Sequence, residues 1–230
     1  MGIEFNNKKT KCSLKITQIV ILFVFFLYIS WIGAWFLEKI LEQYTSWMNT
    51  SQSGFFYWLF MKIIIWVLPA FLIIKHSGED LYDIFGIKRL RSILIWGGGV
   101  GLILVILTII SKLAADQPFA SFELSWTFLG GVIVSPIVEE ITFRGAILGG
   151  LKKQYSFIYA NLLTSIFFLG IHLPGWYFQN VLIENLTAPI GGAISIFILG
   201  FVFGYVVHKS KSVSAGILTH FLNNLSNFLF

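Results

Sequence analysis

Charged residues are scarce in this chain, and cysteine is nearly absent. Asp, Glu, Lys and Arg make up 12% of the 230 residues and hydrophobic residues 57%, whereas about a quarter of a soluble domain is charged. This composition excludes an ordinary soluble domain and predicts a polytopic membrane protein. The single cysteine, Cys12, excludes a disulfide framework and a cysteine metal site. Any metal would need His, Glu, Asp or Asn.

Long apolar runs follow one another along the chain and predict an all-α transmembrane bundle of about seven spans, with six to eight as the range. The expected spans are Ile16–Leu37, Phe55–Ile74, Ile93–Ser111, Trp126–Gly150, Phe157–Leu173, Ile190–Val207 and Val213–Phe230. We divide them into an N-terminal region of three spans, residues 1–125, and a core of four spans, residues 126–230. The first run is too long for a signal peptide and lacks a small-x-small cleavage site, so it is expected to remain as a span.

Within these spans, single residues carry local expectations. Pro69 is expected to kink the second span, and Pro174 with Gly175 to end the fifth. A lone Lys62 in the second span is expected to snorkel to the interface. Gly97 with Gly101, and Gly200 with Gly204, have the four-residue spacing that suits close helix packing.

Basic residues gather beside the apolar runs. With seven spans in alternation, 13 of the 16 Lys and Arg residues fall on the side of the N-terminus, which the positive-inside rule makes cytoplasmic. They do not line one helical face with interleaved aromatics, so nucleic acid is not an expected partner. We expect an integral membrane protein with the lipid bilayer around it and a bacterial cell membrane as its location.

Three charges interrupt the fourth span, in the stretch PIVEEITFRGAILGG. Each costs roughly 2.5 to 3.5 kcal/mol at the centre of a membrane helix if unpaired. At 100° per residue, Arg144 lies about 40° around the helix from Glu140 and about 140° from Glu139. The sequence therefore predicts an ion pair between Glu140 and Arg144, with Glu139 pointing elsewhere.

Candidate partners for Glu139 lie on later spans. His172 follows Phe168 by one turn, and His220 precedes Asn224 by one turn. A buried carboxylate can take a proton from water and return it to a leaving amine. His172 can share that water, and His220 with Asn224 can hold a metal ion or donate to an oxyanion.

These residues form the motifs EExxxR (Glu139, Glu140, Arg144), FxxxH (Phe168 to His172) and HxxxN (His220 to Asn224). In this order and on separate spans, they resemble the CPBP family, also called Abi, of type II CAAX prenyl endopeptidases and bacteriocin-processing or self-immunity proteins. The resemblance covers about 126–230. It implies an intramembrane protease in which Glu139, His172, His220 and Asn224 are catalytic and Glu140, Arg144 and Phe168 support them.

The cofactor stays open at this point. Zinc bound by His172 and His220 has acceptable ligand chemistry, but Glu139 cannot readily be both a third ligand and the general base, so water activated by glutamate alone is favoured. No organic cofactor is expected. The chain has no HExxH, GxSG or GxGD motif of other intramembrane proteases.

The substrate is expected to be a membrane-associated peptide or protein, either a prenylated protein or, in a bacterium, a short membrane peptide. A proton- or ion-coupled transporter and a nonenzymatic bacteriocin immunity protein are the alternative functions, since both could use the same buried polar groups.

Overall fold

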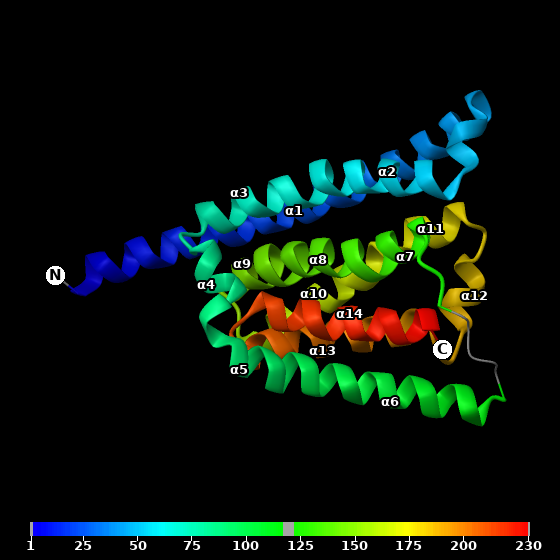
Figure 1. Ribbon diagram of the computed structural model, residues 1–230. Helices are drawn as coiled ribbons and strands as arrows, with labels where there is room; N and C mark the ends of the chain where they lie inside the picture. The colour runs from blue at the N-terminus through cyan, green and yellow to red at the C-terminus, as the bar shows by residue number, and fades with distance from the viewer. Residues whose placement is uncertain (1, 117–121, 230) are drawn as a thin grey trace.

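The computed structural model describes residues 2–116 and 122–229. Every regular element in this part of the chain is helical, and the long helices run side by side in one bundle (Figure 1). The predicted all-α bundle is confirmed. The helix α1 begins at one end of the bundle and α14 ends at the other.

The first two long helices form a hairpin. The chain runs through α1 (Gly2–Tyr44), the 3-10 turn η1 (Ser46–Asn49), α2 (Ser51–Lys62), the π-helical η2 (Ile63–Val67) and α3 (Leu68–His76). The Thr50 side chain caps the second helix by accepting a hydrogen bond from the Ser53 backbone. At Pro69 the helix continues, and the irregularity takes the form of the π-helical segment just before it. Pro69 has no N–H to donate, and this widened turn accommodates its ring.

The third helical segment contains α4 (Leu81–Phe85), η3 (Ile87–Arg89), α5 (Leu90–Ser92), η4 (Ile93–Gly98) and α6 (Gly99–Ala114). It packs against the last helix, α14 (Val213–Leu229). A Cβ added to Gly97 would lie 2.7 Å from Ala215 O, and one added to Gly101 would lie 2.5 Å from Leu222 Cδ1. The predicted close packing at these two glycines is confirmed.

The stretch with the three charges lies in the middle of the bundle. It comprises α7 (Trp126–Phe128), η5 (Leu129–Val134), α8 (Ser135–Glu140), η6 (Ile141–Leu148) and α9 (Gly149–Leu151). Two of these segments, η5 and η6, are π-helical. Such segments are frequent at functional sites in other proteins.

The remaining helices are α10 (Phe157–Gly170), α11 (His172–Phe178), α12 (Leu182–Thr187), α13 (Ala193–Ser210) and α14. The expected end of the fifth span at Pro174 is wrong, since the helix runs on to Phe178. Pro174 is the third residue of α11, where a missing N–H costs no intrahelical hydrogen bond. The irregularity falls instead at Ile171, between α10 and α11.

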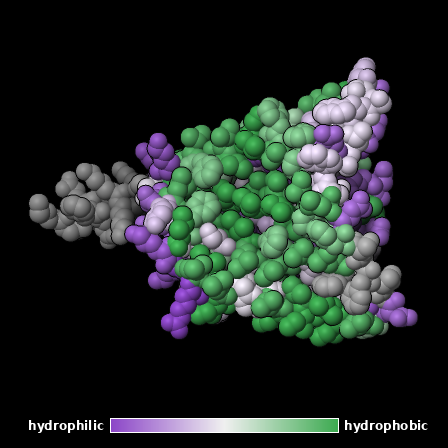
Figure 2. Space-filling model, in the orientation of Figure 1, coloured by the Kyte–Doolittle hydropathy of each residue, from purple (hydrophilic) through white to green (hydrophobic). Residues whose placement is uncertain are grey.

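Five helices of the described residues are long and apolar enough to cross a membrane. They are Lys15–Tyr44, Ser51–His76, Leu81–Ala114, Phe157–Phe178 and Ala193–Ser210. The helix that contains Glu139 is more polar than these five, and the helix that contains His220 is shorter. Both lie among the five in the bundle (Figure 1). On the face that Figure 2 shows, apolar residues cover the middle of the molecule and polar residues gather toward its two ends. The chain is therefore an integral membrane protein, and the count of seven spans stays a prediction.

One hydrophobic core joins the two predicted regions. Val20, Leu27 and Trp66 of the first hairpin belong to the same buried cluster as Phe143 and Phe168. The N-terminal spans therefore pack directly on the helices that carry the motifs, and their side chains can reach the site.

Candidate functional site

A fully buried ionic network lies at the centre of the bundle. Arg144 Nη1 donates to Glu140 Oε1 at 2.8 Å, and Arg144 Nη2 donates to Gly200 O on α13 at 2.8 Å. The predicted ion pair is confirmed. His220 Nδ1 lies 3.0 Å from the same Glu140 Oε1, a contact that the sequence reasoning missed. Because a buried charge without a partner is very costly, these contacts hold three helices in one arrangement.

Two phenylalanines enclose this network. The Arg144 guanidinium carbon lies 4.5 Å from the Phe168 ring centroid and 5.3 Å from that of Phe203. The His220 ring stacks on Phe203 with centroids 4.5 Å apart, and Phe168 meets the His172 ring edge-on at 5.0 Å. Phe168 thus touches both the ionic network and a candidate catalytic histidine.

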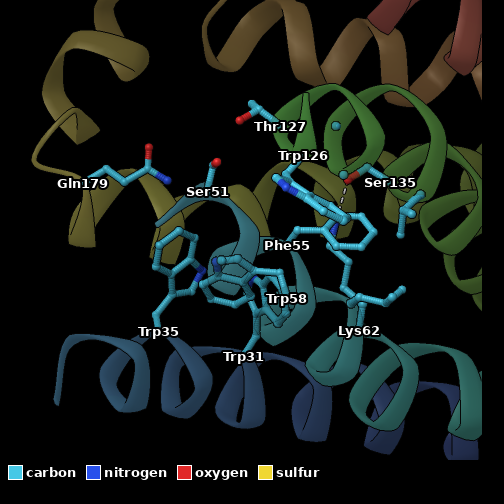
Figure 3. A pocket seen from close by; sticks show the side chains of 15 residues that line it. Trp31, Trp35, Ser51, Phe55, Trp58, Lys62, Trp126, Thr127, Ser135 and Gln179 are labelled. Atoms are coloured by element: carbon cyan, nitrogen blue, oxygen red, sulfur yellow. Dashed lines mark hydrogen bonds between the residues drawn. The ribbon is translucent and has the colours of Figure 1, made fainter. Parts of the chain in front are cut away.

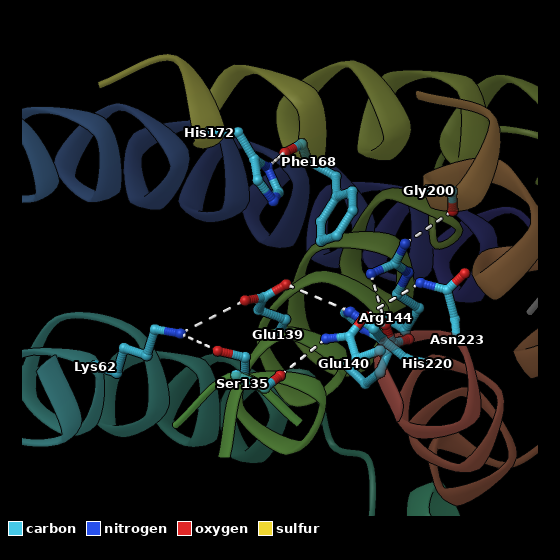
Figure 4. Close-up of polar contacts among 12 residues, drawn as sticks. Lys62, Ser135, Glu139, Glu140, Arg144, Phe168, His172, Gly200, His220 and Asn223 are labelled. Atoms are coloured by element: carbon cyan, nitrogen blue, oxygen red, sulfur yellow. Dashed lines mark hydrogen bonds and ion pairs between the residues drawn. The ribbon is translucent and has the colours of Figure 1, made fainter. Parts of the chain in front are cut away.

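Glu139 points away from this network, as its helical position predicts. Its Oε1 lies 3.5 Å from Lys62 Nζ, and its Oε2 lies 3.9 Å from His220 Nε2. The His172 ring points toward it from α11 (Figure 4). Glu139 and His172 both line a cavity of about 230 Å³. The structure therefore brings Glu139, His172 and His220 together from three different helices.

The hydrogen bonds of the two histidines define their free nitrogens. His172 Nδ1 lies 2.7 Å from Phe168 O. Since a carbonyl oxygen only accepts, His172 Nδ1 carries the proton, and Nε2 can accept a hydrogen bond. In the same way, His220 Nδ1–H donates a hydrogen bond to Glu140. The nitrogen of His220 that faces Glu139 is therefore Nε2.

Asn224 lines neither the cavity of Glu139 nor any other cavity described for this structure. Its Nδ2 donates to Gly131 O on η5 at 2.9 Å, and its Oδ1 accepts from Asn223 at 3.1 Å. These contacts tie α14 to the helix that carries Glu139. The second N–H of the Asn224 amide is not used by these two bonds.

Lys62 belongs to the site, and the expectation that it snorkels is wrong. Its Nζ donates to Ser135 Oγ at 2.5 Å and pairs with Glu139, with 13% of its side chain exposed. The helix begins at Ser51 rather than Phe55, so Lys62 is twelve residues into a 26-residue helix, far from its ends. In the sequence, only the four-residue spacing of Ser135 and Glu139 indicated a second polar partner for a cation beside Glu139.

A second cavity, of about 490 Å³, adjoins the first, since Trp31, Trp35, Lys62 and Gln179 line both. Five of the fifteen residues that line it are aromatic, and we call it the aromatic cavity (Figure 3). It extends to the first turns of α2 and α7, at Ser51 and Trp126, which lie at the end of the bundle where α14 ends. The two cavities together lead from that end to Glu139.

The basic loops lie at the other end of the bundle. They line a separate cavity of about 620 Å³ that includes Arg89, Lys152 and Lys211. Lys153 pairs with Glu79 beside it. Burial lowers the pKa of Lys152, and the Glu79 carboxylate opposes that shift. Arg144 also lines this basic cavity, whereas Glu139 lines the cavity of about 230 Å³ on its other side.

The donor set does not fit a resident metal ion. Among the described residues, no group of three or more His, Cys, Asp or Glu side chains is arranged to hold one. The Lys62 ammonium lies 3.5 Å from Glu139 Oε1, in the position beside this carboxylate that a cation would take.

Comparison with known proteins agrees with these observations. Fold and site together define an integral membrane protein with a carboxylate and two histidines gathered in its interior. Residues 121–226 match the family of type II CAAX prenyl endopeptidases described as Rce1-like. The resemblance expected from the three motifs is confirmed, and the matched segment contains all of them.

A curated relative points the same way. The chain is 28% identical over 92 residues, or 40% of its length, to the Bacillus subtilis (strain 168) protein named "Putative membrane peptidase YdiL". It spans about a third of that relative, since the match covers 32% of it. Both comparisons support a peptidase. Lys62 lies outside the segment that the family match covers.

Proposed function

We propose that the chain is an intramembrane endopeptidase that hydrolyses a peptide bond in a membrane-associated peptide or protein. The observation that carries this proposal is Glu139, a carboxylate 8% exposed in the wall of a cavity that it shares with His172. Such a cavity can admit water and a peptide carbonyl while it excludes lipid. The family match and the peptidase relative support the same reaction class.

Glu139 acts as the general base. It takes a proton from a water molecule, and the water oxygen attacks the carbonyl carbon of the peptide bond. The tetrahedral intermediate then collapses, the C–N bond breaks, and Glu139 returns the proton to the leaving amine. General acid–base catalysis of this kind contributes roughly 10²- to 10⁴-fold to a rate.

The other candidate residues orient the water and bind the oxyanion. With the proton of His172 on Nδ1, its Nε2 can accept a hydrogen bond from the attacking water, which directs the water lone pair to the carbonyl. His220 Nε2 and the second N–H of Asn224 are the proposed groups that bind the oxyanion. Glu140 and Arg144 hold His220 in place through the contacts described above.

The direction of substrate entry follows from the charge distribution. The positive-inside rule puts the N-terminus and the basic loops in the cytoplasm. The two cavities that lead to Glu139 extend to the opposite end, at Ser51 and Trp126. We therefore propose that substrates reach the site from the outer half of a bacterial cell membrane, as short membrane peptides rather than prenylated proteins. No nucleic acid takes part.

The test uses purified protein in proteoliposomes with a pool of lipid-anchored peptides of randomised sequence. Mass spectrometry identifies new peptide termini. We expect defined cleavage products from the wild type and none from Glu139→Ala or His220→Ala, with helix content unchanged by circular dichroism. Cleavage that persists in Glu139→Ala contradicts the mechanism. A wild type that cleaves nothing, but moves protons across the bilayer in a Glu139-dependent way, favours a transporter.

A further inference from the structure

Lys62 is a largely buried lysine that has one hydroxyl partner, one acidic partner and one aromatic neighbour. Its ammonium nitrogen lies 2.5 Å from Ser135 Oγ and 3.5 Å from Glu139 Oε1. The same nitrogen lies 5.7 Å from the Trp66 ring centroid. All of these contacts lie inside the bundle, where only 13% of the Lys62 side chain and 10% of the Glu139 side chain are exposed.

The cost of this arrangement argues for a role. Lysine is strongly hydrated, and its burial in a membrane helix is unfavourable unless the charge is paired. Its flexible chain could carry the amine toward an interface, yet it crosses to the neighbouring helix and ends at Ser135 and Glu139 (Figure 4). Ser135 and Glu139 are one turn apart on α8 and fix the ammonium from two sides.

Lys62 also stands where the two cavities meet. It lines the aromatic cavity together with Ser135, and it lines the smaller cavity together with Glu139 and His172. The Lys62 side chain therefore borders the route from the aromatic cavity to Glu139. The residue comes from the second long helix, outside residues 121–226, so the family match does not account for it.

We propose that Lys62, held by Ser135, is a positioning residue of the active site that keeps the Glu139 carboxylate charged and aimed into the cavity. This inference rests on the proposed function. As Glu139 takes the proton from water, its negative charge passes to the carbonyl oxygen of the tetrahedral intermediate. The ammonium, 3.5 Å from Glu139 Oε1, keeps a positive charge next to this negative charge before and after the step.

The first experiment tests the pairing without any substrate. Thermal unfolding is measured for Lys62→Met, Glu139→Gln and the double variant in the full chain. Each single change leaves one buried group unpaired, whereas the double change leaves neither. We expect the double variant to lose clearly less stability than the sum of the two single variants. Strict additivity overturns the proposal, whether or not the protein is a peptidase.

The second experiment tests the role in catalysis. One peptide that the wild type cleaves in the proteoliposome pool serves as the reporter substrate. With this reporter we expect Lys62→Met to lower kcat by about 100-fold with little change in KM, as a displaced catalytic group does. Lys62→Arg should restore part of the rate. Lys39→Met is the matched control, because Lys39 pairs with Glu42 at the surface and lines none of these cavities. It should keep the wild-type rate.

Chemical rescue separates charge from folding. Lys62→Cys in a Cys12→Ser background has a single thiol, which aminoethylation converts to a lysine analogue. Recovery of kcat on aminoethylation supports the proposal, since the analogue restores the ammonium at nearly the same distance. A wild-type kcat in Lys62→Met, or no recovery on aminoethylation, overturns it. If the wild type cleaves no reporter, the proposed function fails and the stability cycle alone decides the pairing.

Discussion

His220 Nδ1 lies 3.0 Å from Glu140 Oε1, the same oxygen that accepts from Arg144 at 2.8 Å. One carboxylate oxygen therefore joins the EExxxR helix to α14, and the arginine continues the link to α13 through Gly200 O. All three side chains are buried. Glu140 and Arg144 fix the histidine that faces Glu139, so damage to this network is expected to affect both stability and activity.

The network gives a stability prediction. Removing one partner of a buried ion pair costs about 3 to 5 kcal/mol, because the other charge stays uncompensated. Arg144→Met should therefore strongly lower the melting temperature. Arg144→Lys should not restore it, since a lysine ammonium cannot reproduce the fork that reaches both Glu140 and Gly200. Lys153→Met, at the exposed pair with Glu79, is the control and should change stability little. Equal effects at Arg144 and Lys153 would contradict the network.

A comparison of His172, which lies in the site, with His208, which lies outside it, gives a prediction on activity. His172→Gln should lower kcat about 10²-fold or more, because it removes the nitrogen that holds the attacking water. His208→Gln should leave kcat near the wild-type value, since His208 stacks on Phe157 at a 3.8 Å centroid distance and lines neither cavity that leads to Glu139. Reporter kinetics in proteoliposomes measure both. A normal rate in His172→Gln would remove this residue from the mechanism.

Orientation in the membrane can be measured with single cysteines. Thr127→Cys, in a Cys12→Ser background, places a thiol in the wall of the aromatic cavity, and Lys153→Cys places one at the basic end. With intact cells and a membrane-impermeant maleimide, Thr127→Cys should react from outside. Lys153→Cys should react only after the cells are broken. The reverse pattern would invert the proposed topology and the side of substrate entry.

Metal dependence is a separate prediction. Since the donor set does not fit a resident ion, purified protein should contain zinc well below one equivalent, and chelator treatment should leave reporter cleavage unchanged. Elemental analysis and kinetics measure the two quantities. One equivalent of zinc that disappears in His220→Ala, together with loss of cleavage in chelator, would show that a metal is part of the site.

Helical periodicity explains which parts of the site could be predicted from the sequence. The four-residue spacing of Glu140 and Arg144 and the different direction of Glu139 follow from the geometry of one helix. Composition and the apolar runs were enough for the bundle. The spacing of Gly97 and Gly101 predicted a close contact, which α14 supplies.

Contacts between helices could not be predicted in this way. Lys62 looked like a residue near a helix end, because hydropathy set the start of its helix at Phe55 and gave no information on its neighbours. Nor could periodicity show that Glu140 also contacts His220, because Arg144, four residues later on the same helix, was already a sufficient partner for the Glu140 carboxylate. Pro174 was read as a helix end because its position within the first turn of α11 depends on the irregularity at Ile171.

The central claim is that Glu139 activates the water. The most direct test is the single-turnover rate of reporter cleavage in Glu139→Gln, compared with Glu38→Gln. Both glutamates are 8% exposed, but Glu38 is on α1 and lines neither cavity that leads to Glu139. We predict a loss of roughly 10²- to 10⁴-fold for Glu139→Gln, with reporter binding retained and Glu38→Gln close to wild type. A Glu139→Gln protein that cleaves at the wild-type rate would contradict the account.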